Sequence, residues 1–469
     1  MSIMHKEMFG INETLAKEIL EVALSTGGDF AEVYMEKTTN EVLRLHSGKL
    51  STANVSKVKG AAIRIIKGEL EVNSSITDCT YENLLKAAKT LAGSFNDKKH
   101  VEVQPFVEKK VELVVSPKNV RGNDISREVN LLKTASDTIY AYSKEIVQVI
   151  CNLTKTEKRI FVFASDSTWQ TDYRCNTRLS CQAVASDGKE METGFDSFGR
   201  NQGMEMFDDF DVVPFAKQVA HDAVEMLHAE PMQGGEMPVV INNGFGGVIL
   251  HEACVHGLEA TSVAKGMSVF CNKLGQKVAS DIVNAVDDGT NLNAWGSINV
   301  DDEGTPSKCN VLIENGILKS YLVDKRNSKK MNHPITGSSR RESYKYQTTS
   351  RMTNTYFLNG KSTFDEIIKS TEKGLFAEKM GGGSVNPATG EFNFAVQEGY
   401  LVKNGQIDKP VRGATLIGKG SEVLQKIDAV EKGMWMGEGM CGSVSGSVPT
   451  CVGEPLIRVS EILVGGREA

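Results

Sequence analysis

The chain has 469 residues, more than a single hydrophobic core usually holds, so two or three domains are expected. Hydrophobic residues make up 40% and charged residues 24%, as in ordinary globular proteins, and the formal net charge of -7 argues against nucleic-acid binding as the main function. No run of about 18 apolar residues occurs, and the segment from Met1 to Ile11 lacks the apolar core of a signal peptide. We therefore expect no membrane span and a cytoplasmic protein.

The first predicted domain, residues 1–105, is a small α+β unit. Asn12 is a typical N-cap for a helix that runs to about Ser25. Strands are predicted over residues 30–37, 41–45 and 61–66, with a turn at residues 46–49, and a second helix over residues 81–92. The polar segment 96–110 reads as a connector.

The second predicted domain, residues 106–234, is a middle α+β layer. A long helical pattern covers residues 124–145, and another amphipathic helix is predicted over residues 213–228. Between them, alternating apolar and polar residues predict strands over 147–153, 159–164 and 173–185.

The third predicted domain, residues 235–469, is rich in glycine, turns and strands. A strand at 239–242 leads through several glycines into a helix, and Asn315-Gly316 and Asn404-Gly405 each predict a β-hairpin. Residues 380–384 are predicted to form a glycine loop, and the tail 446–466 a pair of strands. The predicted fold class is α+β, with N-terminal and middle α+β layers followed by a β-rich C-terminal domain that carries the helix described next.

The most informative feature is His251-Glu252-Ala253-Cys254-Val255-His256, a His-Glu-x-x-x-His run on this helix. Two imidazoles can share one zinc ion, and a neighbouring carboxylate can take a proton from metal-activated water. The common zinc-protease motif places its histidines four residues apart, whereas these are five apart, about 140° around a regular helix. Either the helix widens by a π-type bulge, or the motif lies where the helix begins or ends.

A catalytic zinc site needs a third protein ligand and an open position. The candidates by residue type and spacing are Glu259, His333, Cys254 and Cys441. Cys254 fits a buried small residue better, because free cysteine is among the most buried residue types. The nine cysteines include no Cys-x-x-Cys pair, so they predict reduced thiols rather than a disulfide framework or a four-thiolate zinc site.

The C-terminal half resembles the TldD/PmbA family, the modulators of DNA gyrase, and in particular its TldD branch. The similar segments are Gly244-Phe245-Gly246-Gly247, His251-Glu252-Ala253, His256-Gly257-Leu258-Glu259, residues 336–344, 351–355, 381–383, 390–394, 398–401 and 409–418, Cys441-Gly442 and Ser447-Val448-Pro449. They span most of residues 240–466. The N-terminal half resembles the family in layout more than in motif.

The resemblance implies a zinc metalloprotease that acts on unfolded or short peptides. It implies that His251, His256 and Cys441 bind the zinc ion and that Glu252 is the general base. It also implies a homodimer, or a heterodimer with a paralogue that lacks the metal motif. The sequence departs from the family at Val255, where many members have glycine, which would allow backbone torsions that valine does not.

Residues for substrate binding are predicted elsewhere in the C-terminal half. Gly381, Gly382, Gly383 and the strand containing Phe392 could let a peptide backbone approach and pair with a strand edge. Further candidates are polar side chains that could bind a peptide carboxylate, brace the domain or donate to the transition state: Arg340, Arg341, Arg351, His333 and Tyr344.

Two other functions compete with the zinc protease. The chain could be a catalytically silent, peptide-binding partner subunit of a TldD/PmbA-type complex, although such a subunit has no need of an intact His251, Glu252, His256 and Cys441. It could also be a zinc hydrolase of non-peptide amides, which a panel of peptides and small amides would distinguish.

Overall fold

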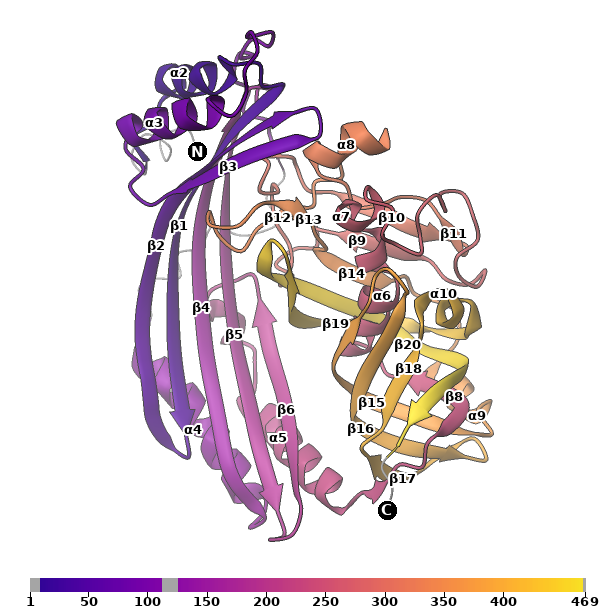
Figure 1. The fold of residues 1–469 in the computed structure, drawn as a ribbon. Helices are drawn as coiled ribbons and strands as arrows, with labels where there is room; N and C mark the ends of the chain where they lie inside the picture. The colour runs from indigo at the N-terminus through magenta and orange to yellow at the C-terminus, as the bar shows by residue number, and fades with distance from the viewer. Residues whose placement is uncertain (1–8, 112–124, 467–469) are drawn as a thin grey trace.

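The computed structural model describes residues 9–111 and 125–466, and arranges them around two large β-sheets that lie side by side. In Figure 1 the sheet of the N-terminal half stands as tall, curved strands, and the β-rich C-terminal half packs beside it. The predicted α+β class is therefore confirmed. The predicted helix start at Asp124 lies outside the described residues.

The first sheet has six antiparallel strands in the order β3-β2-β1-β4-β5-β6. Its strands are β1 Phe30–His46, β2 Lys49–Lys67, β3 Leu70–Ile76, β4 Ile146–Ala164, β5 Trp169–Ser186 and β6 Met191–Arg200. Because β1 pairs with β4, this single sheet runs across the predicted domain boundary at residue 105.

Two pairs of helices cover this sheet. They are α2 Glu13–Leu24 with α3 Tyr81–Ala92, and α4 Ile125–Tyr142 with α5 Val212–His228. Asn12 caps α2 as predicted, its side chain accepting from the Leu15 backbone N–H. Each helix pair has its own core, one against β1 and β2 and one against β4 and β5.

Several strand predictions in this half were too short; for example, residues 147–153 and 159–164 both belong to β4. Residues 30–37 and 41–45 belong to one uninterrupted strand, β1, and residues 61–66 are only the last part of β2. The polar outer half of β2, rich in Ser, Lys and Asn, lacks the apolar alternation that marks a half-buried strand. Its ladder to the better-patterned β1 holds it in the sheet.

The second sheet has twelve strands in mixed orientation, in the path β11-β10-β9-β14-β20-β8-β15-β16-β17-β7, with β18 and β19 attached to it. Its strands are β7 Glu230–Pro231, β8 Gly235–Ile241, β9 Ala285–Asp288, β10 Cys309–Glu314, β11 Ile317–Leu318, β14 Asn354–Phe357, β15 Lys373–Val385, β16 Glu391–Lys403, β17 Gln406–Arg412, β18 Thr415–Lys419, β19 Ile427–Ser443 and β20 Gly446–Gly465. A separate two-stranded ladder joins β12 Ser339–Arg340 to β13 Thr349–Ser350.

Short helices and turns complete the chain, with η1 between β6 and α5 and the others in the C-terminal half. They are α6 Val248–Ala253, α7 Ala260–Val263, α8 Lys325–Met331, α9 Phe364–Lys369 and α10 Gly420–Val423, together with the 3-10 turns η1 Met204–Phe207, η2 Phe245–Gly247, η3 Val255–Leu258 and η4 Leu424–Lys426. Both predicted Asn-Gly hairpins are present, between β10 and β11 and between β16 and β17.

Two further predictions were wrong. Residues 380–384 are not a loop but the irregular end of β15, which pairs with β16 through register shifts. The tail is not a strand pair but one long strand, β20, whose antiparallel partner is β19. In both cases glycines that look like turn signals lie within strands, where pairing with a neighbour overrides their weak strand preference.

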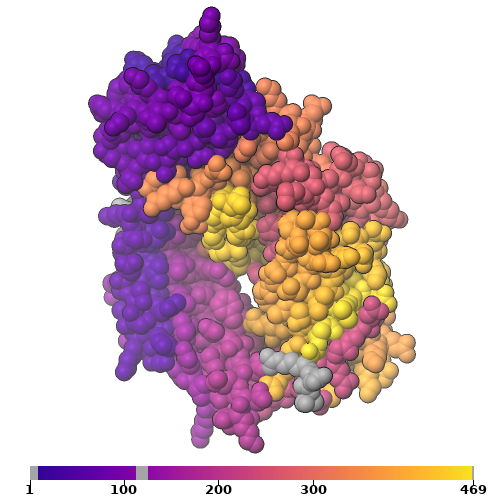
Figure 2. All heavy atoms as spheres, viewed as in Figure 1, coloured from indigo at the N-terminus to yellow at the C-terminus, as the bar shows by residue number. Residues whose placement is uncertain are grey.

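The two sheets are held together by buried contacts. The Arg64 guanidinium of β2 lies 2.6 Å from the Glu303 carboxylate, and the Tyr344 ring packs against Gly60 so closely that a Cβ there would overlap the ring. Figure 2 shows the face of the molecule hollowed between the two halves, beside the yellow tip of the β19–β20 hairpin. Among the described residues, no helix is long and apolar enough to cross a membrane.

Candidate metal centre

Three glycines lie in the connection between β8 and α6, the helix of the His-Glu-x-x-x-His run. Gly244 has a φ of 77°, in the left-handed region that favours glycine. A Cβ on Gly246 would lie 2.4 Å from a carboxylate oxygen of Glu454, and one on Gly247 would lie 2.6 Å from the Gly453 backbone nitrogen. The start of α6 can therefore press directly against β20 only because these side chains are absent.

The unusual spacing of the two histidines is explained by the end of α6. The α-helix ends at Ala253, and Cys254 follows with φ -131° and ψ -62°, outside the helical region. The chain then forms the tighter turn η3, which carries His256. The motif thus lies where a helix ends, the second of the two predicted arrangements, and the break turns His256 back toward His251.

Three potential metal ligands meet here. The Sγ atom of Cys441 lies 3.1 Å from Nε2 of His251 and 3.3 Å from Nε2 of His256. One ligand atom from each of the three residues falls within 4.8 Å of the others. Cys441 comes from β19, close to the turn of its hairpin with β20.

The chemistry of these donors fits a zinc ion. Two imidazole nitrogens and one thiolate are ligands that zinc favours, and three protein ligands leave a tetrahedral ion one open position. The two imidazole planes cross at 89°, so their ring edges converge from different directions. His251 and Cys441 are buried and His256 is partly buried, so the group is shielded from competing water.

The charges in the group favour a thiolate. Burial alone would raise the pKa of the Cys441 thiol, but the His251 and His256 imidazoles outweigh it and lower that pKa well below its usual range. A thiolate, rather than a thiol, is the form that binds metals. Cys254, by contrast, is buried without charged neighbours, and its pKa is raised.

Glu252 lies at the edge of the three-donor group. One carboxylate oxygen is 3.7 Å from Nε2 of His256, and the side chain is 17% exposed. Burial raises the pKa of Glu252, and the two histidines oppose that shift. The carboxylate can therefore reach both the group and the solvent.

Two residues support the donors from behind. Glu259 lies 3.3 Å from the other ring nitrogen of His256, Nδ1, so it can fix the orientation of that ring rather than join the group as a ligand. Arg351 is fully buried and donates to the carbonyl of Cys441 at 2.5 Å and to Gly446 at 2.9 Å. The spacing of Glu259 from His256 is visible in the sequence, but the Arg351 contact joins segments 90 residues apart and has no sequence signal.

The other predicted site residues lie apart from the donors. His333 sits against Ser320 and Tyr321 and lines an open pocket with Asp29 and Lys325. Gly381, Gly382 and Gly383 lie in β15, paired with β16. Arg340 is buried in the wall of a cavity between the two halves, together with Arg341.

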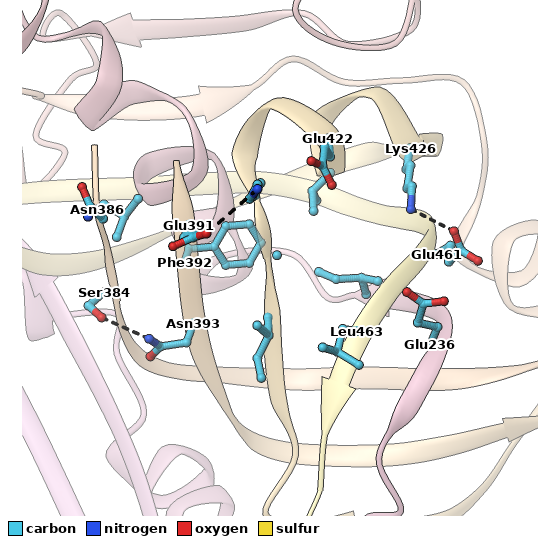
Figure 3. Close-up of a pocket in the computed structure, with 16 residues that line it drawn as sticks. Glu236, Ser384, Asn386, Glu391, Phe392, Asn393, Glu422, Lys426, Glu461 and Leu463 are labelled. Atoms are coloured by element: carbon cyan, nitrogen blue, oxygen red, sulfur yellow. Dashed lines mark hydrogen bonds and ion pairs between the residues drawn. The ribbon is translucent and has the colours of Figure 1, made fainter. Parts of the chain in front are cut away.

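Phe392 is buried at 3% exposure beneath an open pocket of about 730 Å³ on the outer side of the C-terminal sheet. Figure 3 shows its ring among β16, β18 and the α10 segment, with carboxylates such as Glu391, Glu422 and Glu461 around the rim. None of the three metal-ligand candidates lines this pocket, so its size does not connect it with the metal centre.

A second group of potential ligands, His221, Asp222 and Glu398, is also present in the described residues. There the Lys379 ammonium already contacts Asp222 and lies 3.4 Å from Asp196. The lysine supplies the positive charge that a metal would bring. The Cys441 thiol instead has the two imidazoles as its neighbours.

Val255 is accommodated without strain. It is fully buried in the core of the C-terminal half, and its φ is not in the left-handed region. The backbone at this position does not require glycine, so the departure from the family pattern leaves the turn that carries His256 intact.

Comparisons with known proteins agree with this architecture. Residues 31–94, 118–227 and 234–466 match the models of domain 1, the central domain and the C-terminal domain of the PmbA/TldA metallopeptidases. The protein is 35% identical to a metalloprotease TldD homologue of Haemophilus influenzae, over 93% of both chains. It is 27% identical to a zinc metalloprotease TldD homologue of Saccharolobus solfataricus, over 95% of this chain and 99% of the relative.

Solved structures share the fold. TldE from Thermococcus kodakarensis superimposes with a TM-score of 0.74 at 18% identity, covering 96% of this chain and 100% of that one. The matching family models describe metallopeptidases, and the two relatives are metalloproteases by name. The chain belongs to the TldD/PmbA family.

Proposed function

We propose that this protein is a zinc-dependent metalloprotease that hydrolyses peptide bonds in unfolded or short peptides. The observation that carries the proposal is the convergence of His251, His256 and Cys441 with the Glu252 carboxylate beside them. His251, His256 and Cys441 would hold the ion. When bound, zinc supplies a Lewis acid that polarises the scissile carbonyl and makes water a stronger acid.

In this proposal Glu252 is the residue that moves protons. Its carboxylate lies 3.7 Å from His256 and is partly open to solvent, so it can accept the proton of an attacking water. It can then donate that proton to the departing amine, which must be protonated to leave. The histidines cannot share this task, because their Nε2 atoms face the thiol.

The supporting residues keep the three donors in place. Glu259 accepts from His256 on the side away from the thiol, and the contact of Arg351 with the Cys441 carbonyl fixes the end of β19. Preorganisation of this kind matters because small displacements of ligands cost much of the affinity of a metal site.

Two variants and one control test this function, with zinc content and degradation of an unstructured peptide as the measurements. Glu252→Gln should keep the metal and lose at least 100-fold in turnover, because the amide cannot accept a proton. Cys441→Ser should lose most of its metal, because a hydroxyl is a poor zinc ligand. Cys254→Ala is the matched control, a buried motif cysteine that should keep both metal and turnover.

Full turnover by Glu252→Gln would remove it as the base, and full metal content in Cys441→Ser would remove the thiolate from the ligand set. Small amides tested in parallel with the peptide separate a protease from a hydrolase of non-peptide amides. If only small amides are cleaved, the proposed substrate class is wrong.

We also propose that the protein assembles with a second chain of the same family, as a homodimer or with a paralogue. Its likeness to TldE, whose fold covers nearly all of this chain, supports such a pairing. The silent-partner alternative is disfavoured because all four chemically active residues are present. The mass of the particle in solution, alone and mixed with a paralogue, distinguishes the two assemblies.

A further inference from the structure

A second cavity of about 710 Å³ lies between the two halves of the molecule. Its walls come from β1, β4 and β5 on one side and from the segment 340–346 and the β19–β20 hairpin on the other. Met440 and Pro449, paired across the hairpin, line it. Because side chains alternate along a strand, Met440 faces away from the side to which Cys441 points. Val448, the partner of Cys441 across the hairpin, also lines the cavity, so the cavity borders the part of the hairpin that carries Cys441.

The walls of this cavity are predominantly cationic. Six basic side chains line it, against two acidic ones, Glu36 and Glu342; the basic residues are Lys158, Arg174, Arg178, Arg340, Arg341 and Lys345. Four of the six have a carboxylate partner within 4 Å: Lys158, Arg174, Arg178 and Arg341. The other two differ in their surroundings, since Lys345 is exposed and Arg340 is buried.

Arg340 is the unusual member. It is 2% exposed, and in the described part of the chain no carboxylate lies within ion-pairing distance of its guanidinium. One Nη donates to the Met352 carbonyl at 2.7 Å, while Nε has no partner among the described residues. Burial, followed by the nearby Arg174 guanidinium, lowers the pKa of Arg340 to about 9. The Asp302 and Asp287 carboxylates oppose that shift without forming an ion pair with Arg340. A buried cation with no carboxylate in direct contact is unfavourable unless a ligand supplies that contact.

From this geometry we propose that the cavity is a carboxylate-binding subsite, with Arg340 as its anchor, and that its ligand is the free C-terminal carboxylate of a short peptide. The guanidinium fork matches a carboxylate in two parallel hydrogen bonds. The cavity is much larger than one small anion, and Trp295, Met440 and Pro449 give it apolar surface for the residues that precede the carboxylate. The buried carboxylate of Glu36 in the same wall disfavours a doubly charged phosphate.

This inference deepens the proposed protease function, because peptides are both its substrates and its products. It makes the cavity a place where a peptide chain end is recognised by charge rather than by side-chain sequence. Arg340 is then a positioning residue for the peptide and does not take part in proton transfer.

The test measures binding of N-acetylated penta-alanine to the full-length Glu252→Gln protein by calorimetry, with the metal loaded and again after chelation. The free acid should bind at least tenfold more tightly than the C-terminal amide in both states. An amide that ends in Glu distinguishes an acidic side chain from the chain terminus, and inorganic phosphate distinguishes a small anion. Tighter binding of either would overturn the assignment to a C-terminal carboxylate.

Arg340→Met should remove the preference for the free acid, bringing acid and amide within twofold of each other. The matched control is Lys345→Met, an exposed cation of the same wall, which should keep the preference. Arg340→Met should lower the unfolding temperature only modestly, because it leaves the Met352 carbonyl without a donor but no carboxylate without its ion-pair partner. A large loss of thermal stability with the preference retained would make Arg340 a structural residue and end the proposal. Because binding is read without turnover, its failure is distinguishable from failure of the protease function.

Discussion

At the scale of single residues, burial of the Glu438 carboxyl group makes its ionised form unfavourable. Glu438 lies on β19, 6% exposed, with its nearest cation, Arg178, at 3.8 Å. Burial raises the pKa of Glu438 to about 7, and a hydrogen bond from Ser197 and the charge of Arg178 only partly oppose it. Its carboxyl group is therefore still protonated in the folded state where it would already be ionised in the unfolded chain.

The raised pKa of Glu438 makes the stability of the fold depend on pH. Between pH 4.5 and about 7 the unfolded chain loses the Glu438 proton while the folded state keeps it, so this residue destabilises the fold increasingly as pH rises. The effect has an upper bound of about 3 kcal/mol. Glu438→Gln should remove it, so the gap in urea midpoint between variant and wild type should widen from pH 5 to pH 8. Parallel midpoints across that range would contradict the prediction.

Residue types were the part of the site that the sequence could indicate. Two histidines and a carboxylate within six positions predict metal chemistry, and the resemblance to a known family pointed to Cys441. The sequence does not indicate which atoms face each other. The contact of Arg351 with the Cys441 carbonyl, and the lack of an ion-paired carboxylate at Arg340 among the described residues, depend on segments that only folding brings together.

At the scale of elements, the position of α6 depends on a neighbour that is distant in sequence. The short helix α10 packs against the end of α6, and a Cβ on Gly420 would lie 1.6 Å from the Ala253 carbonyl oxygen. No side chain fits there unless one of the two helices moves. Since Ala253 directly follows Glu252, the movement would displace the motif.

Gly420→Ala should therefore destabilise the fold by about 1–3 kcal/mol and weaken metal binding at the same time. The matched control is Gly433→Ala, because a Cβ at Gly433 would meet no atom within 4 Å. Thermal unfolding and a chelator-competition titration of zinc measure the two effects. Wild-type metal affinity in Gly420→Ala would show that the α10 contact does not position the site.

Elements with clear local signals were predicted well and those without were not. A few neighbouring residues suffice to predict the capped amphipathic helices α2 and α3 and the two Asn-Gly hairpins. The glycine-rich end of β15 does not, because β16 alone keeps it extended. Glycine in a strand has the local appearance of a turn, and only the pairing partner distinguishes the two.

At the scale of the whole molecule, buried ion pairs hold the two halves together. Arg64 of β2 contacts Glu32 at 2.9 Å in its own sheet and Glu303 at 2.6 Å in the other half, while Glu32 also contacts Arg341 at 3.1 Å. Arg341 also lines the cavity between the two halves. A sequence alone does not predict this arrangement, because the partners are up to 309 positions apart.

Removal of Arg64 should be costly, because it leaves buried carboxylates with too little positive charge. Arg64→Met deprives Glu303 of its partner at 2.6 Å and Glu71 of one at 3.7 Å, all three side chains being at most 4% exposed. We expect a loss of about 3–5 kcal/mol in stability.

The matched control is Arg127→Met, which breaks an ion pair with Asp208 between side chains 46% and 60% exposed and should cost less than about 1 kcal/mol. The midpoints of urea unfolding measure both, and limited proteolysis reports whether the two halves separate first. If the two variants lose the same stability, the buried charges do not hold the halves together, and the walls of the cavity must be kept in place by apolar contacts such as that of Tyr344 with Gly60.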